Sequence, residues 1–224
     1  MKAIIFDADH TLYRPRTERA YKKKFSFLSS KTGVPAEKLR EKWKSIVSSL
    51  VENGIRDSDR RCREYSTAEA LRSFGIEEGK IEKLVEEALK VFWSEIGLEF
   101  DPEVKNIIAK LKEKYRLCVA SDEFRKGLEM KLNKVFGDWK KYFEFIVSAE
   151  DAGELKPSKR FCEIPLEKFG FGPEDVIFVG DSWERDLEEA HKMNIKTVLV
   201  REEKEGNPDF WIKKITDIEN VLNV

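Results

Sequence analysis

The sequence predicts an α/β fold, with a doubly wound parallel sheet as its core and an all-helical segment inserted into it. Two observations lead to this prediction. Over residues 98–224, short apolar runs rich in β-branched residues alternate with segments of helical periodicity. Over residues 15–97, between the first and the second apolar run, the pattern is helical throughout.

The first strand is predicted over residues 2–6, KAIIF, a short apolar run of the kind that is buried on both faces of a sheet. The inserted segment follows it. Pro35 suits the first turn of a helix whose apolar residues recur from Leu39 to Leu50 and which ends near Gly54. Apolar residues return at helical spacing from Ile81 to Phe92.

Strands and helices alternate after Phe100. Asp101 and Pro102 open a helix, and the remaining strands are predicted over residues 116–120, 143–148, 176–179 and 196–200. Helices are predicted over residues 124–136, 158–169, 184–193 and 209–222. We therefore expect a Rossmann-like core made of residues 1–14 and 98–224, interrupted by a helical domain over 15–97.

Composition excludes several classes of protein. The 224 residues include 42 basic and 43 acidic ones, and the pI near 6.3 argues against a broad basic face for nucleic acid. No apolar stretch is long enough to span a membrane, and the first one reaches Asp7, which is unlike a signal peptide. Three widely spaced cysteines suggest neither disulfides nor zinc, so we expect a cytoplasmic protein. The oligomeric state stays open.

Glutamine is absent, and lysine and glutamate are heavily used. This composition resembles that of hyperthermophile proteins, although a compositional bias of the lineage explains it equally well. Among the three cysteines, Cys118 and Cys162 lie in apolar runs and are expected in the core.

Polar side chains gather where the predicted strands end. Because the carboxyl ends of parallel strands meet at one edge of a sheet, these side chains are expected to lie together. A cluster of carboxylates repels itself and needs a hard cation such as Mg²⁺, and a metal on such a platform commonly serves phosphate chemistry. The residues concerned are Asp7, Asp9, Thr11, Ser121, Asp122, Lys156, Asp181 and Asp186.

Four motifs resemble those of the haloacid dehalogenase superfamily, and they span the whole predicted core. FDADHT, from Phe6 to Thr11, resembles the first motif, hhhhDxDxT, and CVAS, ending in Ser121, resembles the second. Lys156, followed by Pro157, resembles the third, and VGDSWERD, from Val179 to Asp186, resembles the fourth, GDxxxxD. Each motif alone is weak, but all four occur in order, each at the end of a predicted strand.

The resemblance implies a role for each matching position. Asp7 would attack phosphorus and form an aspartyl-phosphate, and Asp9 would protonate the leaving oxygen and then activate water. Ser121 and Lys156 would hold the phosphoryl group, with Thr11 and Asp122 also in the substrate site. Mg²⁺ would be held by Asp7, the carbonyl of Asp9 and Asp181, and by Asp186 either directly or through water.

The inserted segment resembles the helical cap of this superfamily's first type, which implies a small phosphorylated metabolite as substrate. Its basic residues Arg56, Arg60, Arg61 and Arg63 would contact an anionic substrate or, more simply, form surface ion pairs. The run from Lys22 to Lys24 would supply the lysine that phosphonate hydrolysis needs, but such a run is usually a solvated face. His10 stands where the family commonly has glycine, and a structural role in the turn is favoured.

Asp9 favours one activity within the superfamily. Dehalogenases lack an acid at this position, because a halide leaves without protonation, so the sequence favours a magnesium-dependent phosphatase. A phosphomutase uses the same residues and stays an alternative, as does a dehalogenase-like enzyme. From a different class, a phosphorylation-dependent switch or a binding protein would also carry an aspartate, a serine and a lysine on a doubly wound sheet.

Overall fold

The structure is a computed structural model that describes residues 1–222, and the chain divides into two units. One unit joins residues 1–14 to the chain from Leu98 onward, and the other comprises residues 15–97. The chain passes from one to the other through two short strands, β2 (Arg14–Arg16) and β3 (Gly97–Glu99), which pair with each other.

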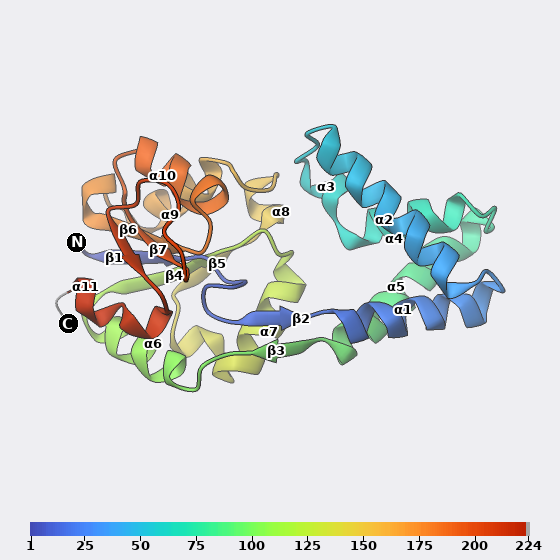
Figure 1. Cartoon of the computed structure of the whole chain (residues 1–224), viewed down its shortest axis with the longest axis horizontal. Helices are drawn as coiled ribbons and strands as arrows, with labels where there is room; N and C mark the ends of the chain where they lie inside the picture. Colours follow the sequence, from blue (N-terminus) through green and yellow to red (C-terminus); the bar gives the residue numbers. More distant parts are fainter. Residues whose placement is uncertain (223–224) are drawn as a thin grey trace. The chain divides into compact units, whose positions relative to one another are not determined.

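A six-stranded parallel sheet forms the centre of the first unit, in the order β5-β4-β1-β6-β7-β8 (Figure 1). Its strands are β1 (Ala3–Phe6), β4 (Arg116–Ala120), β5 (Phe145–Val147), β6 (Val176–Gly180), β7 (Lys196–Val200) and β8 (Phe210–Ile212). All residues of β1 and β6 are buried. This burial on both faces of the sheet explains why the two sequences are continuous apolar runs.

Helices cover both faces of this sheet. Side chains of β1 alternate between the faces: Ile4 and Phe6 join one apolar cluster, and Ala3 and Ile5 the other. The first cluster packs against α6 (Glu103–Lys114), α7 (Arg125–Phe136) and α11 (Glu219–Leu222). The second packs against α9 (Arg160–Phe169) and α10 (Glu188–Lys192), and Figure 1 shows the two sets on opposite sides. The predicted doubly wound fold is confirmed.

Between β2 and β3, the regular elements of the second unit are all helices. They are α1 (Glu18–Thr32), α2 (Ala36–Glu52), α3 (Ser58–Arg61), α4 (Arg63–Arg72) and α5 (Glu78–Glu95). Aromatic rings of Tyr21, Phe25, Trp43 and Phe92 pack together there, with Phe25 and Phe92 buried. Among the described helices of the whole chain, none combines the length and the apolar character that crossing a membrane requires.

The prediction of a helix over residues 209–222 is wrong for the first half of this range. Residues Phe210–Ile212 instead form β8, which pairs with β7 at the edge of the sheet. The side chain of Asp209 accepts hydrogen bonds from the backbone and hydroxyl of Thr197, at 2.8 Å each, and thereby anchors the strand. This long-range contact outweighs the helical spacing of the apolar residues, and the helical part is limited to a 3-10 turn, Ile215–Asp217, and α11.

Lys24 is not part of a solvated face. Its side chain is fully buried, and Nζ donates to the hydroxyl of Thr67 at 2.6 Å. The ammonium also lies 5.0 Å from the ring centre of Phe25 and 5.2 Å from that of Trp43. Lys22 and Lys23 are exposed, as the charged run predicted. Burial lowers the pKa of Lys24 to about 7.

Candidate active site

Three neighbouring strands deliver the first polar side chains to one edge of the sheet. Asp7 follows β1, Ser121 follows β4 and Asp181 follows β6, and β1 lies between the other two. The strand pairing continues for one residue at Asp7, whose N–H donates to the carbonyl of Val179 at 2.8 Å. The parallel register therefore brings these residues together, as their positions after the predicted strands indicated.

Both oxygens of the Asp7 carboxylate have partners. Lys156 Nζ lies 2.6 Å from Oδ1, and the hydroxyl of Thr11 donates to Oδ2 at 3.2 Å. Asp7 is nearly buried. Burial, and then the nearby carboxylate of Asp186, raise the pKa of Asp7 well above its ordinary value, although Lys156 acts in the opposite direction. The site as it stands therefore has an excess of negative charge.

Lys156 is held between two carboxylates. Its ammonium is buried and lies 2.8 Å from Oδ1 of Asp186, in addition to its contact with Asp7. Burial alone lowers the pKa of Lys156, but Asp186 and Asp7 outweigh it, so the pKa is raised. The lysine is thus a cation throughout the range in which proteins are folded.

Asp122 fixes the loop that carries Lys156. Its Oδ1 accepts the backbone N–H of Lys156 at 2.7 Å, and its Oδ2 pairs with the guanidinium of Arg185. These contacts position the lysine. A part for Asp122 in substrate binding stays a prediction. Ser121 is buried beside it, and its hydroxyl accepts the N–H of Glu123 at 3.2 Å.

A turn of π-helix, Trp183–Leu187, brings Asp186 back over the end of β6. Oδ2 of Asp186 accepts the N–H of Ser182 at 3.1 Å. This close return depends on Gly180, because a Cβ there would lie 2.6 Å from the Cβ of Asp186. The glycine of the fourth motif is thereby explained as a position where only a hydrogen fits.

Three carboxylates form a cluster suited to a metal ion. Asp7, Asp181 and Asp186 each present an oxygen, and these oxygens lie within 4.8 Å of one another. Burial and the charge of Asp186 raise the pKa of Asp181 to about 6, although His10, Lys156 and Arg185 act in the opposite direction. The donor set contains only oxygen, so it fits a hard cation such as Mg²⁺.

Asp9, the second aspartate of the first motif, binds a different lysine from Asp7. Nζ of Lys131 lies 2.9 Å from its Oδ1 and 2.7 Å from its Oδ2. The same ammonium lies 2.8 Å from a carboxylate oxygen of Glu123. Sequence reasoning missed Lys131 and Glu123. A signal was present, because Lys131 falls on the apolar face of α7, next to Leu132.

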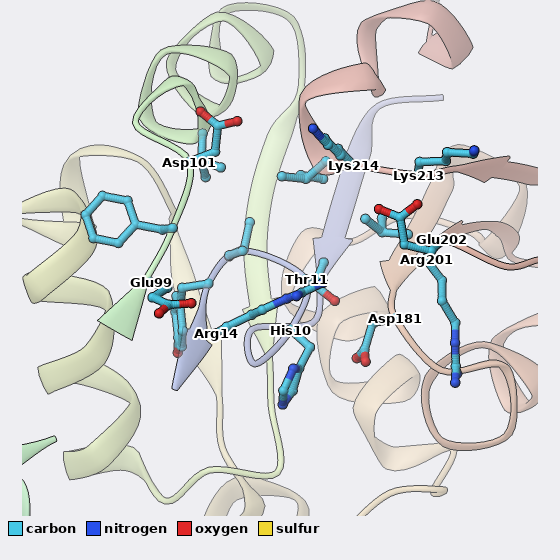
Figure 2. A pocket seen from close by; sticks show the side chains of 16 residues that line it. His10, Thr11, Arg14, Glu99, Asp101, Asp181, Arg201, Glu202, Lys213 and Lys214 are labelled. Atoms are coloured by element: carbon cyan, nitrogen blue, oxygen red, sulfur yellow. The ribbon is translucent and has the colours of Figure 1, made fainter. Parts of the chain in front are cut away.

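His10 has a backbone conformation that explains why glycine is common in this position of the resembling family. Its φ is 68°, in the left-handed region, and its N–H donates to the carbonyl of Tyr13 at 2.6 Å. Its side chain lines a cavity of about 560 Å³, together with Thr11 and Asp181. Figure 2 shows these three side chains around the cavity, with Arg14 beside them.

Comparison with known proteins assigns the chain to a family. Residues 4–200 match the family described as haloacid dehalogenase-like hydrolase. The chain belongs to this family. The four motifs that predicted the membership therefore identify it correctly.

Relatives within this family of hydrolases have several activities. The glyceraldehyde 3-phosphate phosphatase of Methanopyrus kandleri is 22% identical, and the match covers 99% of this chain and 97% of that protein. The pyrophosphatase PpaX of Bacillus cereus is 24% identical over 66% of this chain and 72% of its own length.

Solved structures share the fold. A 2-haloacid dehalogenase from Pseudomonas syringae gives a TM-score of 0.76 at 22% identity, covering 100% of this chain and 98% of its own. A phosphatase of the same family from Thermococcus onnurineus gives 0.67 at 21% identity, with 99% and 98% covered. At this level of identity the likeness establishes the fold alone.

Proposed function

We propose that this haloacid dehalogenase-like hydrolase is a magnesium-dependent phosphatase that hydrolyses a small phosphorylated metabolite through an aspartyl-phosphate on Asp7. The observation that carries the proposal is the arrangement around Asp7. Its carboxylate lies in a buried site with a lysine on one oxygen and two further carboxylates nearby. A second aspartate, Asp9, follows two residues later.

Asp7 is the nucleophile in this proposal. Lys156 and Thr11 each hold one oxygen of its carboxylate, which restricts the side chain to one orientation. Such restriction favours attack because the reacting atoms no longer have to find their alignment. Lys156 also lies where it offsets the charge of an incoming phosphoryl group, together with the hydroxyl of Ser121.

Mg²⁺ would be held by Asp7, Asp181 and the backbone carbonyl of Asp9. Bound there, the ion would neutralise charge on the phosphoryl oxygens. Oδ1 of Asp186 lies 2.8 Å from Nζ of Lys156, and its Oδ2 accepts the backbone N–H of Ser182 at 3.1 Å. We therefore assign Asp186 to holding Lys156 and to contact with the ion through water.

Asp9 is the general acid and base. It would protonate the leaving oxygen in the first step and take a proton from the attacking water in the second. Its side chain is one-third exposed, so it is open to a substrate. An acid here favours phosphate esters over haloacids, because a halide leaving group needs no proton.

Residues 15–97 are proposed to act as the cap of the active site. A cap that closes over a small site excludes bulk water and contacts the part of the substrate that does not react. Within this unit, Arg61 donates to the carbonyl of Ile55 at 2.8 Å, and the guanidinium of Arg63 lies over the rings of Phe92 and Trp93. The basic residues proposed to contact an anionic substrate are Arg56, Arg60, Arg61 and Arg63.

A panel of phosphorylated metabolites tests this function. The purified chain, with Mg²⁺, is expected to release inorganic phosphate from at least one sugar or carboxylic acid phosphate, and EDTA is expected to abolish the release. Transfer of phosphate between positions of a sugar phosphate, without release, would instead indicate a phosphomutase. Chloride release from a 2-chloroacid, with every phosphate ester left intact, would contradict the proposal.

A further inference from the structure

Lys131 has an unusual place for a lysine. Its side chain is 1% exposed, on the face of α7 that Leu128, Leu132 and Val135 bury against the sheet. Burying an ammonium costs several kcal/mol unless opposite charges surround it closely. An apolar residue would fill this position in an ordinary amphipathic helix. The lysine therefore calls for an explanation beyond packing.

Two carboxylates meet the ammonium of Lys131. Both oxygens of Asp9 lie within 2.9 Å of Nζ, and Glu123 lies within 2.8 Å. Glu123 is itself 3% exposed, whereas Asp9 is 33% exposed. The three residues thus form a chain that runs from the buried interior to the surface of the active site, with the proposed acid at its open end.

The backbone of Asp9 forms an isolated bridge with Tyr13, which does not by itself fix the rotamer of the Asp9 side chain. It lies in the loop between β1 and β2, immediately before the left-handed residue His10. A short side chain on a loop samples several rotamers, and proton transfer requires one of them. A lysine that binds both carboxylate oxygens limits this choice.

We propose that Lys131, itself held by Glu123, is a positioning residue for Asp9 and fixes its carboxylate for proton transfer. The inference rests on the acid role of Asp9 given above. Glu123 matters because it binds the same ammonium from the buried side. Glu123 therefore keeps Lys131 in the place from which it restricts the orientation of the Asp9 carboxylate.

Stability alone does not explain this arrangement. Replacing a buried ion pair by residues of similar size without charge is often neutral or stabilising. A double substitution, Lys131→Met with Glu123→Gln, removes both charges and leaves no buried charge without a partner. The glutamine keeps the oxygen that accepts the N–H of Phe124 at 3.0 Å. This double variant is expected to fold and to keep Asp7, Asp9 and Lys156 intact.

The test compares leaving groups. For wild type and each variant, kcat/KM is measured with Mg²⁺ on a series of aryl phosphates, from dinitrophenyl to phenyl phosphate, and on an alkyl phosphate. This parameter reports formation of the phosphoenzyme, the step in which Asp9 protonates the leaving oxygen. Lys126→Met, an exposed lysine of the same helix, is the matched control and is expected to behave as wild type.

In the double variant, kcat/KM is expected to fall ~10- to 100-fold for the alkyl phosphate and less than ~3-fold for dinitrophenyl phosphate. Asp9→Asn is expected to show the same selectivity with larger losses. An equal loss on all substrates, or no loss at all, while Asp9→Asn remains selective, would overturn the role of Lys131. A wild type that hydrolyses no phosphate ester would overturn the proposed function, and this inference with it.

Discussion

Nζ of Lys156 lies 2.6 Å from Oδ1 of Asp7, and both side chains are almost completely buried. The pair joins the end of β1 to the loop before α9, which are far apart in the sequence. Its position makes Lys156 responsible both for the orientation of the proposed nucleophile and for the balance of charge in the site.

Lys156→Met is expected to reduce hydrolysis of an aryl phosphate by at least ~100-fold, because the phosphoryl group loses a preorganised cation. It is also expected to destabilise the protein by about 3–5 kcal/mol, since Asp7 and Asp186 are left buried without a counter-charge. Steady-state kinetics and urea unfolding measure the two effects. Lys159→Met, an exposed lysine nearby, is the control. Wild-type activity in Lys156→Met would contradict the assignment.

Gly180→Ala tests the close return of Asp186 over β6. The new methyl group would lie 2.6 Å from the Cβ of Asp186 and must displace it. We expect a loss of about 1–3 kcal/mol of stability and a Mg²⁺ affinity at least ~10-fold lower, measured by calorimetry. Gly79→Ala in α5, where a Cβ meets nothing within 4 Å, is expected to be neutral or stabilising. Equal effects of the two substitutions would refute this account of Gly180.

The buried Lys24 predicts a dependence of stability on pH. Its pKa is about 7 in the folded unit, against 10.5 ordinarily, so between these values the unfolded chain binds more protons. The free energy of unfolding should therefore rise with pH from about 7 to about 10. Arg63 adds to the lowering of this pKa, and Glu64 opposes it.

Lys24→Met is accordingly expected to stabilise the protein by at least about 1 kcal/mol at pH 7, with a benefit that shrinks as the pH approaches 10. Thermal unfolding of the full chain at several pH values measures this. Lys23→Met, the exposed neighbour, should show no such trend. A benefit independent of pH would mean that the pKa of Lys24 is not lowered in the folded unit.

His10→Gly is expected to preserve both stability and activity, because glycine adopts a φ near 68° without strain. His10→Val, with a branched side chain at the same φ, should lose about 1–2 kcal/mol. Urea unfolding of both variants distinguishes a role of the turn from a role of the imidazole. If His10→Gly lost most of its activity at unchanged stability, the imidazole would have to act on the substrate.

Much of the fold followed from local pattern. The buried strands β1 and β6 are short, wholly apolar and followed by charged motifs, so both their positions and their shared edge were predictable. The strand over Phe210–Ile212 was not predictable, because it depends on pairing with β7 and on the hydrogen bonds between Asp209 and Thr197. A sequence window does not contain such contacts.

Some residues of the candidate site were predictable from the sequence and others were not. Asp7, Lys156 and Asp181 follow strand ends or carry a motif, and their convergence was expected. Lys131 and Glu123 carry no motif. Lys131 reaches the site because α7 packs its apolar face beneath the loop of Asp9, and Glu123, in the loop between β4 and α7, pairs with the same ammonium. A lysine among apolar helix positions is the one local sign of such a residue.

Asp7 is expected to become phosphorylated during turnover. The most direct test mixes the enzyme with an aryl phosphate and Mg²⁺, quenches with acid within milliseconds, and locates the phosphoryl group by mass spectrometry of peptides. Asp9→Asn serves as a second sample, since slower hydrolysis should let the intermediate accumulate. We predict one phosphorylated peptide, modified at Asp7 and absent from Asp7→Asn. Steady release of phosphate with no phosphorylated Asp7 in either sample, or with undiminished release by Asp7→Asn, would contradict the account.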